Sequence, residues 1–309
     1  MLKFLLRRTL QSAVALLALV TVVFFLARLT GDPVDLFLPL EATEEARARV
    51  AAQYGFDQPI PVQYVRYLGG VLSLDFGPSI FQGRPAIDPV LEAFPVTLML
   101  ALVTMSIAAA LAILVGAVAA YRPDGVFDRI ASVVTLIGAS TPDFWLAIVA
   151  ILFFSVSLGL LPTSGTGGIA FWVLPVGVLL TRPLGVLTQV VRSSFLNALS
   201  APYVRTARAK GASTRRVIFV HALRNALLPV ITVAGDLLAG FLNGAVVVET
   251  IFGWPGIGHL MISSIRQRDF AVVQAAILVT AVAVFVMNIL IDFAYARLDP
   301  RVSVRQAKQ

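Results

Sequence analysis

Three ionisable residues lie within long apolar stretches of the sequence, where charges are rare. Asp143 follows Pro142, Arg182 lies midway along the next apolar stretch, and Asp236 lies in a later one. At the centre of a bilayer such a residue costs about 2.5–3.5 kcal/mol unless it pairs or faces water. We therefore consider three interpretations: a buried salt bridge that fixes helix packing, a lining for the path of a polar solute, or stretches whose ends are misplaced.

The residue types that enzymes and metal sites need are sparse. The chain has no cysteine, and His221 and His259 lie too far apart for a local metal motif. The only lysines are Lys3, Lys210 and Lys308, and none precedes serine or threonine, so a P-loop is excluded. No H-E-x-x-H or G-x-S-x-G sequence occurs. We expect no catalytic residue, metal or cofactor in this chain, so any ATP that it uses must bind a partner.

A basic segment, residues 203–229, has the pattern of two short helices joined at a turn. Its first helix stops at Gly211, the residue type that most often takes the left-handed conformation after a helix. Ser213 can cap a second helix through Asn225, and Pro229 can open the apolar stretch that follows. Small side chains here leave room for close approach by another protein: Ala207, Ala209 and Ala212.

The composition places these features in a membrane protein. Apolar residues make up 58% of the 309 positions and charged residues 13%, about half of what a soluble domain carries. Several charge-poor windows have the roughly 20 residues that cross a bilayer as a helix. The sequence predicts an all-α membrane protein with six transmembrane helices. The predicted spans are Leu10–Arg28, Pro95–Ala120, Ile130–Leu158, Phe171–Val191, Leu228–Ile251 and Phe270–Tyr295.

The distribution of basic residues predicts the orientation. If the chain has six spans, both termini lie on the same side of the membrane. The loops after the second and fourth spans, which together hold most of the loop arginines, lie on that side too. Because Lys and Arg favour cytoplasmic loops, both termini are expected in the cytoplasm. The same bias explains the net charge of +7, so we expect no nucleic-acid partner. No small-residue cleavage site follows the basic N-terminus, which predicts an uncleaved first helix.

Two predicted loops are too long to be simple connectors. The outer one, residues 30–94, contains a charged helical stretch at Glu41–Gln53 and then a segment rich in proline and glycine. The inner one, residues 192–227, contains the basic segment. Neither has the pattern of a nucleotide-binding or hydrolase domain. Glu41, Glu44 and Glu45 form either a solvated helix face or part of a docking surface for an external protein.

The basic segment resembles the EAA loop of permeases from ABC importers, specifically the dipeptide/oligopeptide/nickel family, of the dipeptide permease B type. Two features depart from the general EAA pattern without departing from this subfamily: Arg205 replaces its glutamate, and Pro229 lies far from Gly211. Further stretches that match the family extend over nearly the whole chain: Gly31-Asp32-Pro33, Tyr54–Gly77, Val247–Gly258 and Tyr295–Arg301.

The resemblance implies a permease subunit that translocates short peptides by alternating access. Its coupling helix would insert into a cleft of a cytoplasmic ATPase, with ATP and Mg²⁺ bound on that partner. Two such ATPases, a second homologous permease and an external substrate-binding protein would complete the assembly. Arg182 would then meet a peptide carboxylate or carbonyl. The implied ATPase contact comprises Tyr203, Arg205, Thr206, Ala207, Arg208, Ala209, Lys210, Gly211, Ala212 and Ser213.

Glu249 and Thr250 end the fifth predicted span, and Trp254 follows in a Trp-Pro-Gly sequence. Tryptophan favours the headgroup level, so this group can be an interfacial anchor. The resemblance implies instead a periplasmic gate or a contact with the binding protein.

Three rival functions remain. Within the family, the solute can be a nickel chelate, glutathione or another small peptide-like compound. A secondary transporter also carries charges at mid-membrane, but it needs no basic segment to contact an ATPase. It should also show internal repeats, and we find none. An intramembrane enzyme needs a nucleophile–base pair or metal ligands, and the motifs for these are missing.

Overall fold

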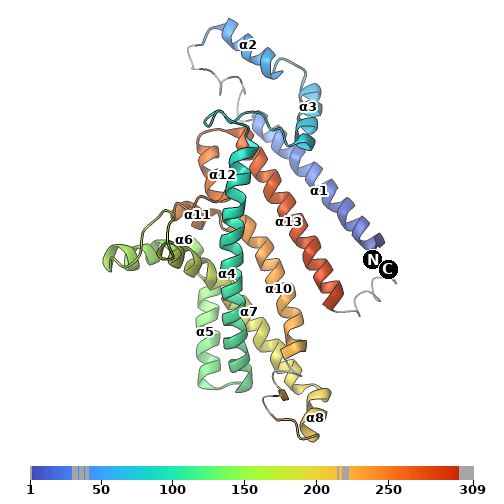
Figure 1. Ribbon diagram of the computed structural model, residues 1–309, viewed down its shortest axis with the longest axis vertical. Coiled ribbons are helices and arrows are strands. Elements are labelled where there is room, and N and C mark those ends of the chain that lie inside the picture. Colours follow the sequence, from blue (N-terminus) through green and yellow to red (C-terminus); the bar gives the residue numbers. More distant parts are fainter. Residues whose placement is uncertain are drawn as a thin grey trace. The chain divides into compact units, whose positions relative to one another are not determined.

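The computed structural model describes residues 2–29, 42–213 and 223–298, together with positions 34, 38, 216 and 217. These residues are helical apart from connecting turns and one isolated β-bridge between Pro78 and Pro85 (Figure 1). The chain divides into two compact units, Met1–Thr97 with Pro255–Phe285, and Leu98–Trp254 with Val286–Gln309. The helices are α1 (Leu2–Leu29), α2 (Glu44–Tyr54), α3 (Ile60–Ser73), α4 (Ile87–Tyr121), α5 (Val126–Ser140), α6 (Asp143–Ala150), the π-helix η2 (Ile151–Ser157), α7 (Ala170–Ser200), α8 (Pro202–Ala209), α10 (Leu223–Gly244), α11 (Val246–Ile251), α12 (Ile257–Arg266) and α13 (Phe270–Leu298).

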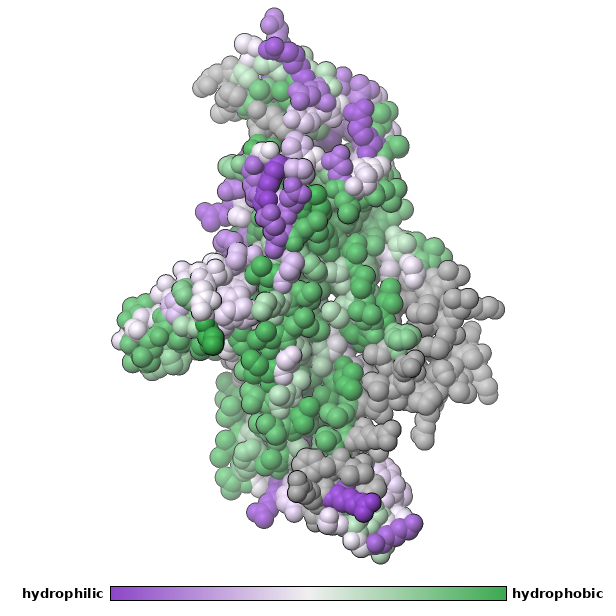
Figure 2. All heavy atoms as spheres, in the orientation of Figure 1, coloured by the Kyte–Doolittle hydropathy of each residue, from purple (hydrophilic) through white to green (hydrophobic). Residues whose placement is uncertain are grey.

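The longest helices have the length and composition of membrane spans. In the described part of the chain, four helices are long and apolar enough to cross a membrane. The number of such spans rises to five if one bent pair of helices counts as a single span. Over α4 and α5, hydrophobic side chains cover the visible face, as expected of helices in contact with lipid (Figure 2). The predicted all-α membrane class is confirmed. The four single helices are Thr9–Leu29, Ile87–Tyr121, Ala170–Ser200 and Phe270–Ile291.

The predicted third span, Ile130–Leu158, is not one straight helix. Its first part belongs to α5 and its second to α6 and η2, and the two parts are bent by 101°. Thr141, between them, is extended, with φ −82° and ψ 131°. Pro142 explains this conformation, because its ring disfavours helical geometry at the preceding residue and it has no N–H to donate.

Two other predicted boundaries change. The fifth predicted span, Leu228–Ile251, is divided between α10 and the short α11, with the break at Ala245. The fourth span was predicted to end at Val191, but α7 continues through Ser200. The second helix predicted after Ser213, and the motifs at residues 31–33 and 295–301, lie wholly or partly outside the described residues.

In the second unit, α5, α6, α8, α10 and α11 all pack against α7. Glycines allow the helices of this unit to approach one another closely. A Cβ at Gly185 of α7 would overlap the backbone oxygen of Thr135 and lie 2.7 Å from the Cβ of Ala139, both in α5. A Cβ at Gly116 of α4 would lie 2.7 Å from Val191. α7 is therefore the element through which a displacement of α8 reaches the other helices of this unit.

In the first unit, the beginnings of α4, α12 and α13 enclose a small apolar core that includes Val90, Ile257 and Val272. Ser79 donates a 2.5 Å hydrogen bond to the buried carboxylate of Asp269, which lies just before α13. α2 overlaps the helical stretch predicted at Glu41–Gln53 but begins three residues later, at Glu44, and Glu41 itself lies outside the described residues. The N-cap of α2 is Thr43, and the helix ends at Gly55 with φ +71°.

Candidate functional site: an exposed helix joined to the membrane core

α8 and the turn after it form a short, well-capped knob. Pro202 occupies the first turn of the helix, where its missing N–H is not needed. At the other end Gly211 has φ +79°, the left-handed conformation predicted from the sequence. Its N–H donates to the oxygen of Arg208 at 2.9 Å, and the N–H of Ala212 donates to the oxygen of Ala207 at 3.1 Å. These paired bonds are a Schellman motif, which satisfies the last carbonyls of the helix.

Ser213 also has the predicted role of a cap. Its side-chain oxygen accepts a 3.4 Å hydrogen bond from the N–H of Arg216, and its carbonyl oxygen accepts one of 3.0 Å from Val217. The chain therefore turns immediately after Gly211, and the two bonds to Ser213 follow that turn, so the knob has a defined shape.

The knob is held from beneath and presents its remaining side chains to solvent. Val204 is fully buried, α8 packs against α7, and Phe195 and Ala198 near the end of α7 are buried as well. Ala207 and Ala212 are half-buried. Hydrophilic side chains gather around α8 in the space-filling view (Figure 2). The other residues of the predicted ATPase contact are exposed: Tyr203, Arg205, Thr206, Arg208, Ala209, Lys210, Gly211 and Ser213.

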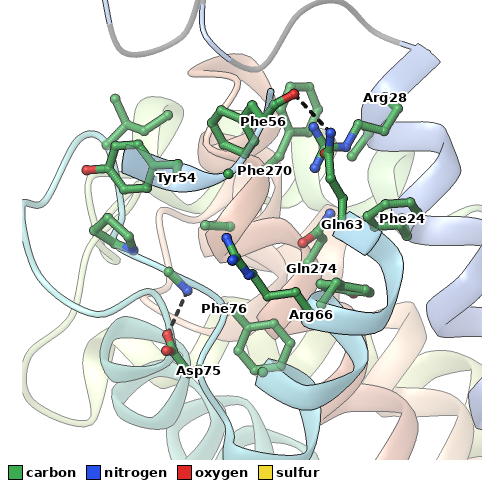
Figure 3. Close-up of a pocket in the computed structure, with 18 of the residues that line it drawn as sticks. Phe24, Arg28, Tyr54, Phe56, Gln63, Arg66, Asp75, Phe76, Phe270 and Gln274 are labelled. Atoms are coloured by element: carbon green, nitrogen blue, oxygen red, sulfur yellow. Dashed lines mark hydrogen bonds between the residues drawn. The ribbon is translucent and has the colours of Figure 1, made fainter. Parts of the chain in front are cut away.

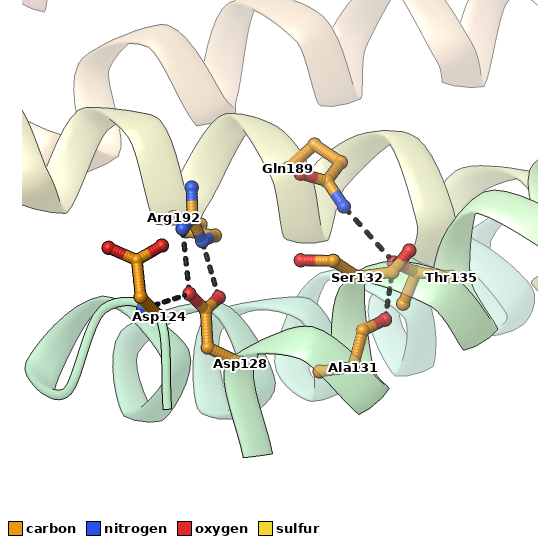
Figure 4. Close-up of polar contacts among 7 residues, drawn as sticks. All are labelled: Asp124, Asp128, Ala131, Ser132, Thr135, Gln189 and Arg192. Atoms are coloured by element: carbon orange, nitrogen blue, oxygen red, sulfur yellow. Dashed lines mark hydrogen bonds and ion pairs between the residues drawn. The ribbon is translucent and has the colours of Figure 1, made fainter. Parts of the chain in front are cut away.

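A partly buried ion pair connects α7 to α5 just before the knob (Figure 4). The Arg192 guanidinium donates to both oxygens of Asp128, at 2.5 and 2.7 Å, and the N–H of Asp124 donates to one of them at 2.9 Å. Asp128 is 2% exposed. Gln189, one helical turn away, donates to the Thr135 hydroxyl at 3.3 Å.

Sequence reasoning missed this pair. Arg192 was interpreted only as one of the basic loop residues that set the orientation, whereas it is part of α7. Its partner lies 64 positions earlier in the sequence. The sequence carried one signal for this pair. Asp128 lies among the arginines of the loop after the second predicted span, and that loop was predicted to lie on the same side of the membrane as Arg192.

The three intramembrane charges are only partly brought together. Asp143 is the first residue of α6 and is half-buried, and it lies close enough to Arg182 of α7 for a Coulombic interaction. Among the described residues, no ion pair within 4.0 Å joins them. Asp236 of α10 is exposed and pairs with neither. The first of the three interpretations was a salt bridge that fixes helix packing. This conformation contains no tight salt bridge among these three residues.

The residues predicted as a gate are packed inside the second unit. Glu249 of α11 is fully buried, and Trp254 is 2% exposed and stacks edge-to-face on Trp172, with ring centroids 4.6 Å apart. The hydroxyl of Thr250 donates to Val246 within the same helix. The N–H of Gly165 donates to the oxygen of Phe252 at 2.8 Å, which attaches the loop before α7 to this turn. Trp254 is thus not presented to lipid headgroups by this chain.

Comparison with known proteins agrees with this architecture. Residues 112–304 match the family described as the inner membrane component of binding-protein-dependent transport systems, and residues 1–101 match the N-terminal region of such components. The oligopeptide transport system permease protein AppB of Bacillus subtilis is 38% identical, over 97% of this chain and 98% of its own length. The dipeptide permease DppB of the same organism is 36% identical over 99% of both chains. The glutathione permease GsiC of Salmonella paratyphi A is 37% identical over 98% and 99%.

Solved structures show the same fold at much lower identity. The methionine transporter MetNI, in an inward-facing conformation, aligns with a TM-score of 0.58 at 16% identity, over 68% of this chain and 96% of that one. An amino acid ABC transporter aligns with a TM-score of 0.55 at 15% identity, over 68% and 94%.

The chain therefore belongs to the family of inner membrane components of binding-protein-dependent transport systems, the permeases of ABC importers. The predicted resemblance to the peptide and nickel branch of these permeases is confirmed. Membership makes the chain a multi-pass inner-membrane protein that works with separate ATPase and substrate-binding proteins.

Proposed function

We propose that this permease translocates short peptides and receives the energy of ATP through α8. The named relatives AppB and DppB support peptides as the solute class. The observation that carries the coupling role is the geometry of α8 and its turn: most side chains of Tyr203–Ser213 are exposed, Val204 is buried, and only the extended residue Ala201 separates α8 from α7. A short rigid helix of this kind suits insertion into a cleft of a partner ATPase.

Movement of α8 would reach the membrane through α7. The Arg192–Asp128 pair connects α7 to α5 at the end nearest α8, and Gly185 brings the same two helices together further along. When nucleotide closes two ATPases, the two α8 knobs of a permease pair would be drawn together. The membrane helices would then change from one open side to the other, because nucleotide binds one of these states better.

The α5–α7 contacts also support six spans with both termini in the cytoplasm. Asp128 at the start of α5 meets Arg192 near the end of α7, so the two helices run antiparallel and α7 ends on the side where α5 begins. This requires the bent pair Val126–Ser140 and Asp143–Ser157 to cross the membrane as a broken span, rather than to return as a re-entrant loop. The apolar helix Pro229–Leu242 of α10 supplies the sixth crossing.

This topology predicts the labelling of introduced cysteines, which are unique because the chain has none. In intact cells, Thr166→Cys should react with a membrane-impermeant maleimide, and Ala209→Cys should react only after the inner membrane is opened. Both positions are exposed. Reaction of both from the same side would contradict six spans.

The proposed assembly contains a second homologous permease, two ATPases and an external binding protein. Asp143, Arg182 and Asp236 are proposed to face the path between the two permeases, where their charges would meet the ends of a peptide. Glu249, Thr250 and Trp254 are proposed to form the gate toward the binding protein, and the outer insertion at residues 30–94 lies on that side.

A second candidate solute is glutathione, because GsiC is as similar to this chain as the peptide permeases are. The two proposals share their mechanism and differ only in the solute that the binding protein delivers.

The decisive experiment is reconstitution of the co-expressed complex in proteoliposomes. We expect ATPase subunits to co-purify, and their activity and solute uptake to rise several-fold when binding protein and peptides of two to five residues are added. Glutathione and a nickel chelate serve as comparison solutes. A complex that lacks the ATPases and still moves solute down an ion gradient would make the chain a secondary transporter and overturn the proposal.

A further inference from the structure

The outward face of α3 is apolar. Val62, Val65, Gly69 and Leu72 recur at intervals of three and four residues, so they lie along one side of the helix. All four are exposed, Val65 by 68% and Leu72 by 88%. A helix that faces water normally carries charged or polar side chains on its outward side. This face of α3, which we call the apolar face, is therefore suited to an apolar partner.

The neighbouring helix α2 has the outward composition expected of a helix in water. Its exposed residues include Glu44, Glu45 and Arg49. In contrast, α3 has a single charged residue, Arg66, at the edge of its apolar face. Arg66 extends into a cavity of about 400 Å³ that it lines, toward Gly55, where a Cβ would overlap its Nη1 atom (Figure 3). The apolar face itself therefore carries no charge, and the two helices are suited to different surroundings.

The opposite side of α3 packs against the membrane span α1. The hydroxyl groups of Tyr64 and Thr21 are hydrogen-bonded at 2.7 Å, and the ring centroids of Tyr64 and Tyr67 both lie 5.3 Å from that of Phe24. Thr21 and Phe24 lie below the end of the candidate span Thr9–Leu29 by about 12 and 8 Å, at 1.5 Å per residue. These contacts place α3 beside the part of α1 that enters the hydrocarbon layer.

The apolar face is continuous with the exposed side of α1. The ring of Phe25, a residue that is 46% exposed, is stacked on Tyr64 with the centroids 6.2 Å apart. Tyr64, Leu68 and Leu72 follow one another along α3 at intervals of four residues, so they connect Phe25 to the apolar face. One apolar surface therefore extends over both helices. The other exposed hydrophobic residues at this end of α1 are Val22, Leu26 and Leu29.

We propose that α3 is an interfacial helix whose apolar face inserts among the lipid acyl chains around the end of α1. Acyl chains are favoured over a second permease because helix contacts within membranes favour small residues, whereas this surface consists mainly of Val, Leu and Phe. They are favoured over a water-soluble binding protein because the surface begins beside a membrane span. Lipid thus anchors the outer insertion through α3 and leaves the charged α2 in water.

Spin labels on introduced cysteines test this insertion in the complex reconstituted in proteoliposomes. This chain has no cysteine of its own, and any cysteines of the partner subunits are replaced. Labels at Val65→Cys and Leu72→Cys should collide more often with oxygen, which dissolves in lipid, than with a water-soluble nickel chelate. The ratio of the two collision rates should give a depth of about 5–10 Å below the phosphate level. Both positions are exposed, so both variants should fold.

Ala48→Cys is the matched control, since Ala48 is an exposed residue of α2 in the same insertion. Its label should collide mainly with the nickel chelate. Equal access of the chelate to the labels on α2 and α3 would overturn the proposal. Protection of the α3 labels from both oxygen and the chelate would also overturn it, because a protein such as the second permease would then cover α3. Access of the chelate that ends only when binding protein is added would assign the apolar face to that protein instead.

Discussion

Replacement of Gly211 by proline should abolish most of the ATPase stimulation that binding protein and peptide produce in the reconstituted complex, by about tenfold or more. Gly211 has φ +79°, whereas proline is restricted to about −65°. Proline also removes the N–H that bonds Arg208, so the Schellman motif cannot form and the knob loses its shape. Measurement of ATPase activity with and without binding protein and peptide separates this defect from loss of the ATPase subunits, which co-purification reports.

Other substitutions at the same position separate backbone geometry from side-chain space. No atom of the described residues lies within 4 Å of a Cβ built at Gly211, so alanine there meets only the left-handed strain, about 1–2 kcal/mol. Asparagine tolerates this conformation and should retain most of the stimulation. Gly240→Ala, in α10, also meets no neighbouring atom and has no left-handed strain, so it is the matched control. Full stimulation of ATPase activity in Gly211→Pro would show that the energy of ATP reaches the membrane helices by a route other than α8.

Much of this architecture was predictable because it depends on local sequence. Charge-poor windows predicted the long helices, since the bilayer tolerates few other elements. The helix at Glu41–Gln53 and the left-handed Gly211 followed from residue preferences that act over one or two turns. The family resemblance used the same local motifs, and the comparisons confirmed it.

The remaining features depend on contacts between distant residues or on competing local signals. Pro142 can break a helix locally, but the 101° bend also depends on how α5 and α6 pack on α7. α3 was not predicted, because Gly69 and Gly70 near its end read as a loop, whereas its packing on α1 through Tyr64 stabilises it. The Asp128–Arg192 pair has no local signature at all.

That pair supports the second large prediction: Arg192→Gln should lower the thermal midpoint of the complex and also reduce stimulated ATPase activity. The variant removes the cation beside Asp128, a residue that is 2% exposed in the wild-type chain, and leaves the Asp124 N–H as the remaining donor among the bonds described here. Breaking a fully buried pair costs about 3–5 kcal/mol and an exposed one up to about 1 kcal/mol. Because the Arg192 side chain is 25% exposed, we expect an intermediate loss of about 1–3 kcal/mol.

A double variant distinguishes an unpaired charge from a lost connection between helices. Asp128→Asn combined with Arg192→Gln removes both charges, so the thermal midpoint should recover in part, since the buried charge caused most of the loss. The stimulated ATPase activity should remain low, because two amides hold α7 to α5 less firmly than a bidentate ion pair does. Arg84→Gln is the control, since it breaks the exposed Arg84–Glu92 pair outside this pathway and should change neither quantity appreciably. Recovery of both quantities in the double variant would mean that the pair stabilises the fold without transmitting the movement of α8.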